Sequence, residues 1–346
     1  MSAGARPPAN APRRPPTGAS DHRADAVRRI ADAVLYEGYL LWPYRKSALK
    51  NQQRFTFGGV YPPAWEDSSR MQAQVLLEGE RNASVEIRVR FLHVVRRQVL
   101  KLDALDATPE EVEELEVDGR RWVSWEEAVE REVGLGPIRV PAGQELEQIP
   151  GGAIRRSWQE LEGDVSLARE SLRPGLSRLT LQIANTTPWA GTRREPTPWT
   201  GTERERALHR TFCSTHAILR TDESAWVSLT DPPPAFRAEA EACENSGLWP
   251  VLVGEPGERD TLLASPIILS DHPQIAPESP GNLFDSGEID QMLVLNILAM
   301  TEEERRDMRD ADPRAREILE RTEALSDEEI MRLHGAVREF GLVRAR

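Results

Sequence analysis

Three side chains with metal-binding chemistry lie close together in the sequence: His209, Cys213 and His216. Imidazole nitrogens and thiolates are common ligands of zinc and nickel. On a continuous helix, the spacing i, i+4 and i+7 would place all three side chains on one face, and Cys243 would complete a set of four. The sequence therefore contains a candidate nickel or zinc site at His209, Cys213 and His216.

The elements that must position these residues favour a simpler interpretation. Residues 203–212 predict a helix, but the following THAIL segment predicts a strand, which would send Cys213 and His216 to opposite faces. Such residue types are also common in protein cores, and Cys243 lies on the apolar face of another predicted helix. No nucleophile motif surrounds either cysteine. We therefore keep the metal site as the alternative hypothesis and expect no bound cofactor.

The other residues that could do chemistry also have simple explanations. The sequence has no phosphate-binding loop. The acidic runs Glu302–Glu304 and Glu328–Glu329 lie at predicted helix starts, where the helix dipole favours acids. His272 and Glu278 belong to a proline-rich loop that is either functional or a rigid connector, and we favour the connector. No catalytic residue is identified.

Composition excludes two classes of function. The 346 residues include 44 Lys and Arg against 57 Asp and Glu, which gives a net charge of -13. Nucleic acid is not an expected partner, because phosphate binding requires a basic surface. No apolar run reaches the roughly 20 residues that cross a bilayer, so we expect no membrane span. The N-terminus lacks the apolar core of a secretory signal, and we expect a cytoplasmic location.

Hydrophobic patterning predicts an α+β fold. Apolar and polar residues alternate over 85–91 and 179–183, which is typical of half-buried antiparallel strands. Continuously apolar runs at 248–254 and 261–270 predict strands buried on both faces. The capping box at 108–111 predicts a short helix. We expect a β-rich antiparallel body, either a sandwich or an open barrel, with a C-terminal helical segment.

The chain divides into three parts by composition. Residues 1–20 are rich in Pro and Arg and predict a disordered tail. Residues 21–285 form the β-rich body, and a division into two subdomains near residue 200 remains open. Residues 286–346 predict helices, one of which begins with a capping box at 301–304.

Three segments carry a family resemblance: LYEGYLLWPYRKSALKNQQRFTFGGVYP, SPIILSDHPQIAPESPGNLFDSGEIDQMLVLNILAMTEEER and ILERTEALSDEEIMRLHG. The chain resembles, over residues 33–63 and 210–336, a bacterial family encoded in actinobacterial gene clusters for uptake NiFe hydrogenases. The resemblance implies a non-catalytic accessory role in hydrogenase maturation, assembly or scaffolding, with a hydrogenase subunit or maturation factor as the protein partner. It implies no role for any residue. The alternative is a metal carrier for nickel or zinc, or an enzyme, with its site near His209, Cys213 and His216.

Overall fold

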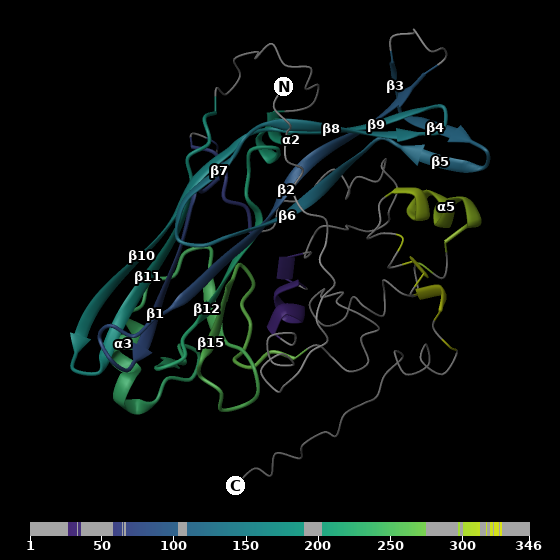
Figure 1. Ribbon diagram of the computed structural model, residues 1–346. Helices are drawn as coiled ribbons and strands as arrows, with labels where there is room; N and C mark the ends of the chain where they lie inside the picture. The colour runs from purple at the N-terminus through teal and green to yellow at the C-terminus, as the bar shows by residue number, and fades with distance from the viewer. Residues whose placement is uncertain are drawn as a thin grey trace, which may run out of the picture.

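Strands dominate the part of the chain that the computed structural model describes: residues 27–32, 34–35, 58–63, 65, 67–102, 109–189, 203–274, 297, 300–311, 316, 319–320, 322–324 and 326. This part is a mostly antiparallel β protein with three open sheets and few short helices. The predicted antiparallel, β-rich body is therefore confirmed. Figure 1 shows a broad two-sheet region, from which a narrower arm extends to the upper right. The predicted tail and most of the predicted C-terminal helices lie outside the described residues.

The first sheet has five strands in the order β13-β1-β11-β10-β7. Their bounds are Ala225–Val227 for β13, Arg70–Glu78 for β1, Leu176–Asn185 for β11, Leu161–Arg173 for β10 and Gly136–Val140 for β7. The alternation predicted over 179–183 falls within β11, where Leu179, Leu181 and Ile183 are fully buried. One face of this sheet therefore supplies apolar side chains to a core.

The second sheet is organised around the long strand β2, Glu86–Lys101. Its path is β14-β15-β12-β2-β9-β8, and β3 and β6 also pair with β2. The bounds are Trp249–Leu252 for β14, Thr261–Ser265 for β15, Cys213–Arg220 for β12, Gly152–Trp158 for β9, Gly143–Ile149 for β8, Glu110–Val112 for β3 and Trp125–Val133 for β6. β12 pairs with residues 86–92 of β2, whereas β9 pairs with residues 96–101. The single strand β2 therefore belongs to two regions.

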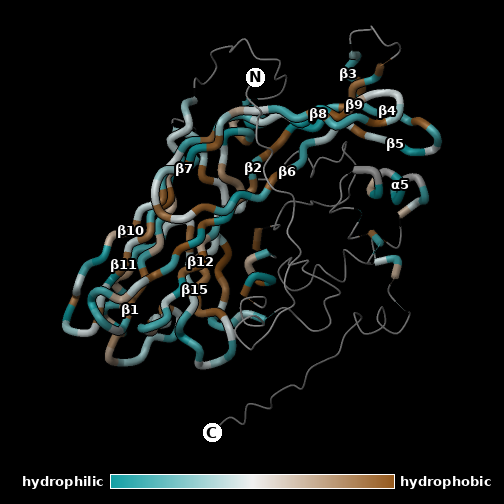
Figure 2. Tube along the Cα trace, in the orientation of Figure 1, coloured by the Kyte–Doolittle hydropathy of each residue, from teal (hydrophilic) through white to brown (hydrophobic). Residues whose placement is uncertain are grey.

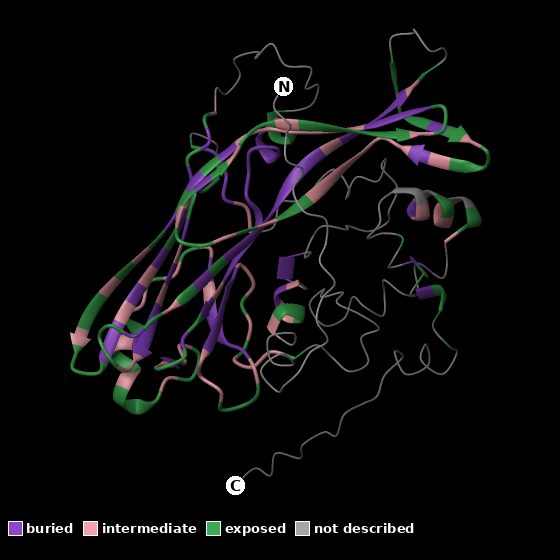
Figure 3. Cartoon of the chain, in the orientation of Figure 1, coloured by how far each residue is buried: buried purple, intermediate pink, exposed green. Residues whose placement is uncertain are grey.

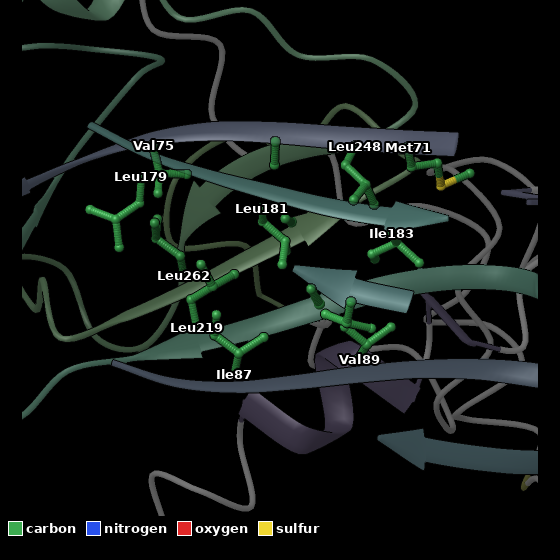
Figure 4. Close-up of a cluster of buried hydrophobic side chains, with 14 of the residues drawn as sticks. Met71, Val75, Ile87, Val89, Leu179, Leu181, Ile183, Leu219, Leu248 and Leu262 are labelled. Atoms are coloured by element: carbon green, nitrogen blue, oxygen red, sulfur yellow. The ribbon is translucent and has the colours of Figure 1, made fainter. Parts of the chain in front are cut away.

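The main core lies between these two sheets. Val75 and Leu181 of the first sheet and Val89 and Leu219 of the second belong to one cluster of buried side chains (Figure 4). Figure 2 shows hydrophobic residues concentrated along β12 and β15, and β15 is buried throughout, as the apolar run at 261–270 predicted. The two large sheets are both open, and both contribute apolar side chains to this one core.

The arm consists of the second half of β2, residues 96–101, together with β3, β8, β9 and the two-stranded third sheet. That sheet pairs β4, Glu114–Val117, with β5, Arg120–Val123. A small cluster of Val99, Leu115, Trp122 and Ile154 joins it to β2 and β9. The prediction of a helix beginning at 108–111 is wrong, because Glu110–Val112 instead pairs with residues 99–101 of β2 as β3.

Helices cover only small areas of the described structure. The helical residues 27–32 and 34–35 pack Ala31 and Val34 against β14 and β15. The remaining helices are α2 at Glu203–Leu208, a 3-10 helix at Pro234–Phe236, α3 at Arg237–Glu241 and α5 at Glu302–Ala311. No helix in the described residues is long and apolar enough to span a bilayer.

The capping box predicted at the start of α5 is confirmed. The Thr301 backbone N–H donates to Glu304 Oε2 at 2.7 Å, and the Glu304 N–H donates to Thr301 Oγ1 at 3.3 Å. These reciprocal bonds satisfy backbone donors that the first turn of a helix leaves free. α5 contacts β5, so this C-terminal helix lies beside the arm (Figure 1).

Candidate functional site

The predicted metal-binding residues lie where α2 leads into β12. α2 ends at Leu208, so the predicted helix over 203–212 is shorter than expected. His209 and Arg210 form a turn, and Cys213 begins β12. The predicted THAIL strand is confirmed, and the three candidate residues do not lie on one continuous helix.

A β-bulge nevertheless places Cys213 and His216 on the same face of the sheet. Cys213 lies opposite Leu92 and His216 lies opposite Arg90, so β12 advances three residues while β2 advances two. The extra residue occurs at the bulge, where Ser214 has a φ of 51°. Directly opposed residues of paired strands share a face, and Leu92 and Arg90 are two residues apart. The bulge thus reverses the expectation that Cys213 and His216 would face opposite sides.

His209 joins two neighbouring strands through both nitrogens of its ring. Its Nδ1 lies 3.3 Å from the Val94 carbonyl oxygen of β2, and its Nε2 lies 3.0 Å from Glu126 Oε1 of β6. The imidazole is buried, whereas the Glu126 side chain is more than one-third exposed. This pairing fixes the turn after α2 against β2 and β6.

A further buried histidine, His93, lies at the same junction. Burial lowers the pKa of His93 to about 3, and electrostatic interactions with Arg131 and His209 lower it further. Burial also lowers the pKa of His216 to about 3, and its Nδ1 lies 3.1 Å from the Ser214 carbonyl oxygen. Both imidazoles are therefore neutral at neutral pH. His93 was missed as a candidate, although its position within the apolar run FLHVV signals burial.

The Cys213 thiol is enclosed by apolar side chains. It is fully buried in a cluster with Leu35, Tyr61, Leu92, Val94 and Leu208. Burial raises the pKa of Cys213 well above the usual range of a thiol, and the nearby Glu126 carboxylate raises it further. Since the thiolate is the reactive form of cysteine, Cys213 is a poor nucleophile in this setting.

The fourth proposed ligand, Cys243, belongs to a different part of the molecule. It is half-buried just after α3 and packs in a cluster with Leu76 and Val227 of the first sheet. In the ranges that the structure describes, no group of three or more His, Cys, Asp or Glu side chains is placed to hold a metal ion.

The described part of the loop at His272 is hydrogen-bonded to the segments that follow β13 and end β14. The His272 backbone N–H donates to the Leu252 carbonyl oxygen at 2.7 Å, and the Asp271 carboxylate accepts from the Leu252 N–H at 2.8 Å. Asp271 also accepts from Thr230 Oγ1 at 2.7 Å. These bonds tie the ends of β13 and β14 together. Glu278 lies outside the described residues.

The buried histidines and the Cys213 thiol thus lie near the point on β2 where its pairing with β12 ends and its pairing with β9 begins. Burial leaves the imidazoles of His93 and His216 uncharged and the Cys213 thiol protonated. Comparisons with protein-family models, curated proteins and solved structures returned no match to this chain.

Proposed function

We propose that this chain is a non-catalytic accessory protein of NiFe hydrogenase maturation, assembly or scaffolding in the cytoplasm. It acts by binding a protein partner, either a hydrogenase subunit or a maturation factor. Support for the hydrogenase connection comes from the resemblance of residues 33–63 and 210–336 to a family encoded beside such enzymes.

The burial of the most reactive side chains carries the non-catalytic part of the proposal. His93, Cys213 and His216 are each 0% exposed. A catalytic base must reach the proton that it abstracts, and a nucleophilic cysteine must reach its substrate as the thiolate. Enclosed neutral imidazoles and a protonated thiol are instead suited to joining strands within a core.

Affinity purification from the native host tests the hydrogenase connection. The full chain, tagged at one end, is expressed under hydrogenase-inducing conditions, and co-purifying proteins are identified by mass spectrometry. We expect enrichment of a hydrogenase subunit or maturation factor over a tagged cytoplasmic protein of similar charge. Recovery of no hydrogenase component would overturn the proposal.

A nickel or zinc carrier is the second candidate, because the bulge turns Cys213 and His216 toward the same side of the second sheet. Metal content of the purified chain, measured by mass spectrometry after incubation with Ni²⁺ or Zn²⁺, separates the two functions. The accessory role predicts no stoichiometric metal. One bound ion per chain that is lost in Cys213→Ser and retained in Cys243→Ser would establish the carrier instead.

A further inference from the structure

The arm ends in an open strand edge at β8. In the described residues β8 pairs only with β9, and five of its seven residues are exposed. Figure 3 shows this exposed strand along the arm. Leu146, at its centre, is 58% exposed. A strand of this length without a second neighbour presents unpaired backbone groups to any chain that can pair with them.

The edge strands β7, β14, β13 and β6 have protection that β8 lacks. β7 contains Pro137 and β14 contains Pro250, and proline removes a backbone donor. β13 has only three residues, and the backbone N–H of its central residue, Trp226, donates a hydrogen bond to the Arg259 carbonyl oxygen at 2.7 Å. β6 also has a single described partner strand, but only three of its nine residues are exposed. β8 is therefore the most accessible of these edges.

The hairpin register identifies the backbone groups that point outward. β8 and β9 are joined by the two-residue turn at 150–151, which is flanked by the pair Ile149 and Gly152. In such a hairpin the flanking pair is hydrogen-bonded, and the pairs then alternate along the ladder. Gln144, Leu146 and Gln148 consequently direct their N–H and C=O groups away from β9.

Surplus negative charge accompanies this edge. Glu145 and Glu147 share one face of β8. Arg156 Nη1 lies 3.8 Å from Glu145 Oε1 and 2.7 Å from Glu147 Oε2. Arg156 also pairs with Glu127, which in turn pairs with Arg97. These three carboxylates and two guanidinium groups leave one unbalanced negative charge.

This charge opposes pairing between two copies of β8. Antiparallel pairing centred on Leu146 would place Glu145 of one copy opposite Glu147 of the other. Like charges directly opposed across a ladder are destabilising, whereas an opposite charge at the same position is favourable. The edge is therefore complementary to a basic strand.

We propose that β8 is the docking edge for an extended segment of a partner protein that carries Arg or Lys at alternate positions. The segment adds to the sheet as a new strand, bonds to the backbone groups of Gln144, Leu146 and Gln148, and places its basic side chains beside Glu145 and Glu147. This inference rests on the proposed function, because it assigns the surface and the chemistry of the protein partner.

A synthetic peptide tests the edge without any hydrogenase component. The probe is a fluorescently labelled nonapeptide of alternating Arg and Val with blocked ends, and binding to the full chain is measured by fluorescence anisotropy. We expect saturable binding that weakens as salt is raised. A peptide of alternating Glu and Val should not bind. Absence of saturable binding, or equal binding of the two peptides, would overturn the proposal.

Two changes at Leu146 separate backbone pairing from side-chain contact. Leu146→Pro removes an outward N–H while leaving the hydrogen bonds to β9, and it should weaken peptide binding by about three- to tenfold, as one lost hydrogen bond predicts. Leu146→Ala retains the N–H and should bind within about twofold of the wild type. Equal binding by the proline and alanine variants would contradict strand addition.

N-methylated peptides provide the same test if Leu146→Pro does not fold. One peptide is methylated at the backbone nitrogen of every Arg, and the other at the backbone nitrogen of every Val. The two peptides thereby lose the two alternate sets of backbone N–H donors. One of the two peptides should lose binding, and unchanged binding of both would overturn the proposal of strand addition at β8. If affinity purification recovers a hydrogenase component but the peptide does not bind, only the proposal of docking at β8 is overturned. If the peptide binds but no hydrogenase component is recovered, the proposed function is overturned.

Discussion

The two halves of β2 are stabilised by different interactions. In the first half, Ile87, Val89 and Phe91 point into the core between the two large sheets. In the second half, Arg97 pairs with Glu127, and Gln98 accepts hydrogen bonds from Arg155 of β9. The same strand therefore passes from an extensive apolar core into a narrow arm with a small core and many polar contacts.

This contrast separates a stabilising region from an accessible one. Burial of apolar area contributes more to stability than exposed ion pairs, so the two-sheet region should determine whether the chain folds. The arm keeps its strands paired with a smaller cluster and charged side chains, and it leaves β8 open. We therefore expect substitutions in the two regions to differ in how much stability they cost and in how many strands they affect.

Phe91→Ala should have the largest effect on stability. Phe91 is fully buried and stacks on Phe212 with ring centroids 4.7 Å apart. Removing a buried aromatic ring costs about 3–5 kcal/mol, because it loses transfer free energy and leaves a cavity. Urea unfolding measures the change, with the partly exposed Val129→Ala as a control expected to cost less. A loss below about 1 kcal/mol would contradict the central role of the core between the two large sheets.

Ile154→Ala should destabilise the arm more than the two-sheet region. Ile154 is buried against Val99, Leu115 and Trp122. Its truncation should cost about 2–3 kcal/mol, near the low end for such changes because the cluster is small. Hydrogen exchange should accelerate in β4, β5, β8 and β9 while β11 and β12 remain protected. Equal acceleration in both regions would show that they unfold as one cooperative unit.

Lowering the pH should destabilise the two-sheet region through its buried histidines. The pKa values of His93 and His216 are about 3 in the folded protein, against 6.5 in the unfolded chain. The unfolded state therefore binds more protons between these values, and the stabilisation present above pH 6.5 is lost as pH falls toward 3. Together the two groups predict a loss of about 2 kcal/mol between pH 6.5 and 5.5.

Urea unfolding at the two pH values measures this loss. A His216→Asn variant should retain about half of the pH dependence, because only His93 then contributes. The same slope in the variant and the wild type would show that other groups cause the effect.

Arg156→Gln should change stability less than Phe91→Ala or Ile154→Ala. Arg156 pairs with Glu127 at 2.8 Å and Glu147 at 2.7 Å, and the partly exposed pairs are worth about 1 kcal/mol or less. The difference from the wild type should shrink in high salt. Arg220→Gln, which breaks a more exposed pair with Asp222, serves as the control and should have no measurable effect. A salt-independent loss at Arg156 would point to packing instead of charge.

Local patterns predicted some elements well because their causes are local. The alternation over 179–183 lies within β11, and the Thr301 and Glu304 side chains form the predicted capping box. The same capping pattern at 108–111 predicted the wrong element, since β3 satisfies its backbone by pairing with β2 instead. A capping signal is weak evidence where a distant strand edge competes for the segment.

The candidate site was only partly predictable for the same reason. Residue types identified His209, Cys213 and His216, and the THAIL pattern predicted a strand. The relative orientation of Cys213 and His216 depends on the bulge in the pairing of β12 with β2. No local pattern in β12 specifies that extra residue.

The sequence by itself determined that this chain is acidic and rich in antiparallel strands, because charge follows from composition and strand alternation is a property of neighbouring residues. Only the tertiary structure decided that β2 serves both the two-sheet region and the arm. It also decided the face on which Cys213 lies, since the Thr215 N–H bonds to the Gly58 carbonyl oxygen at 2.9 Å from far along the chain. Such pairings satisfy backbone groups between distant segments, and no local sequence pattern encodes them.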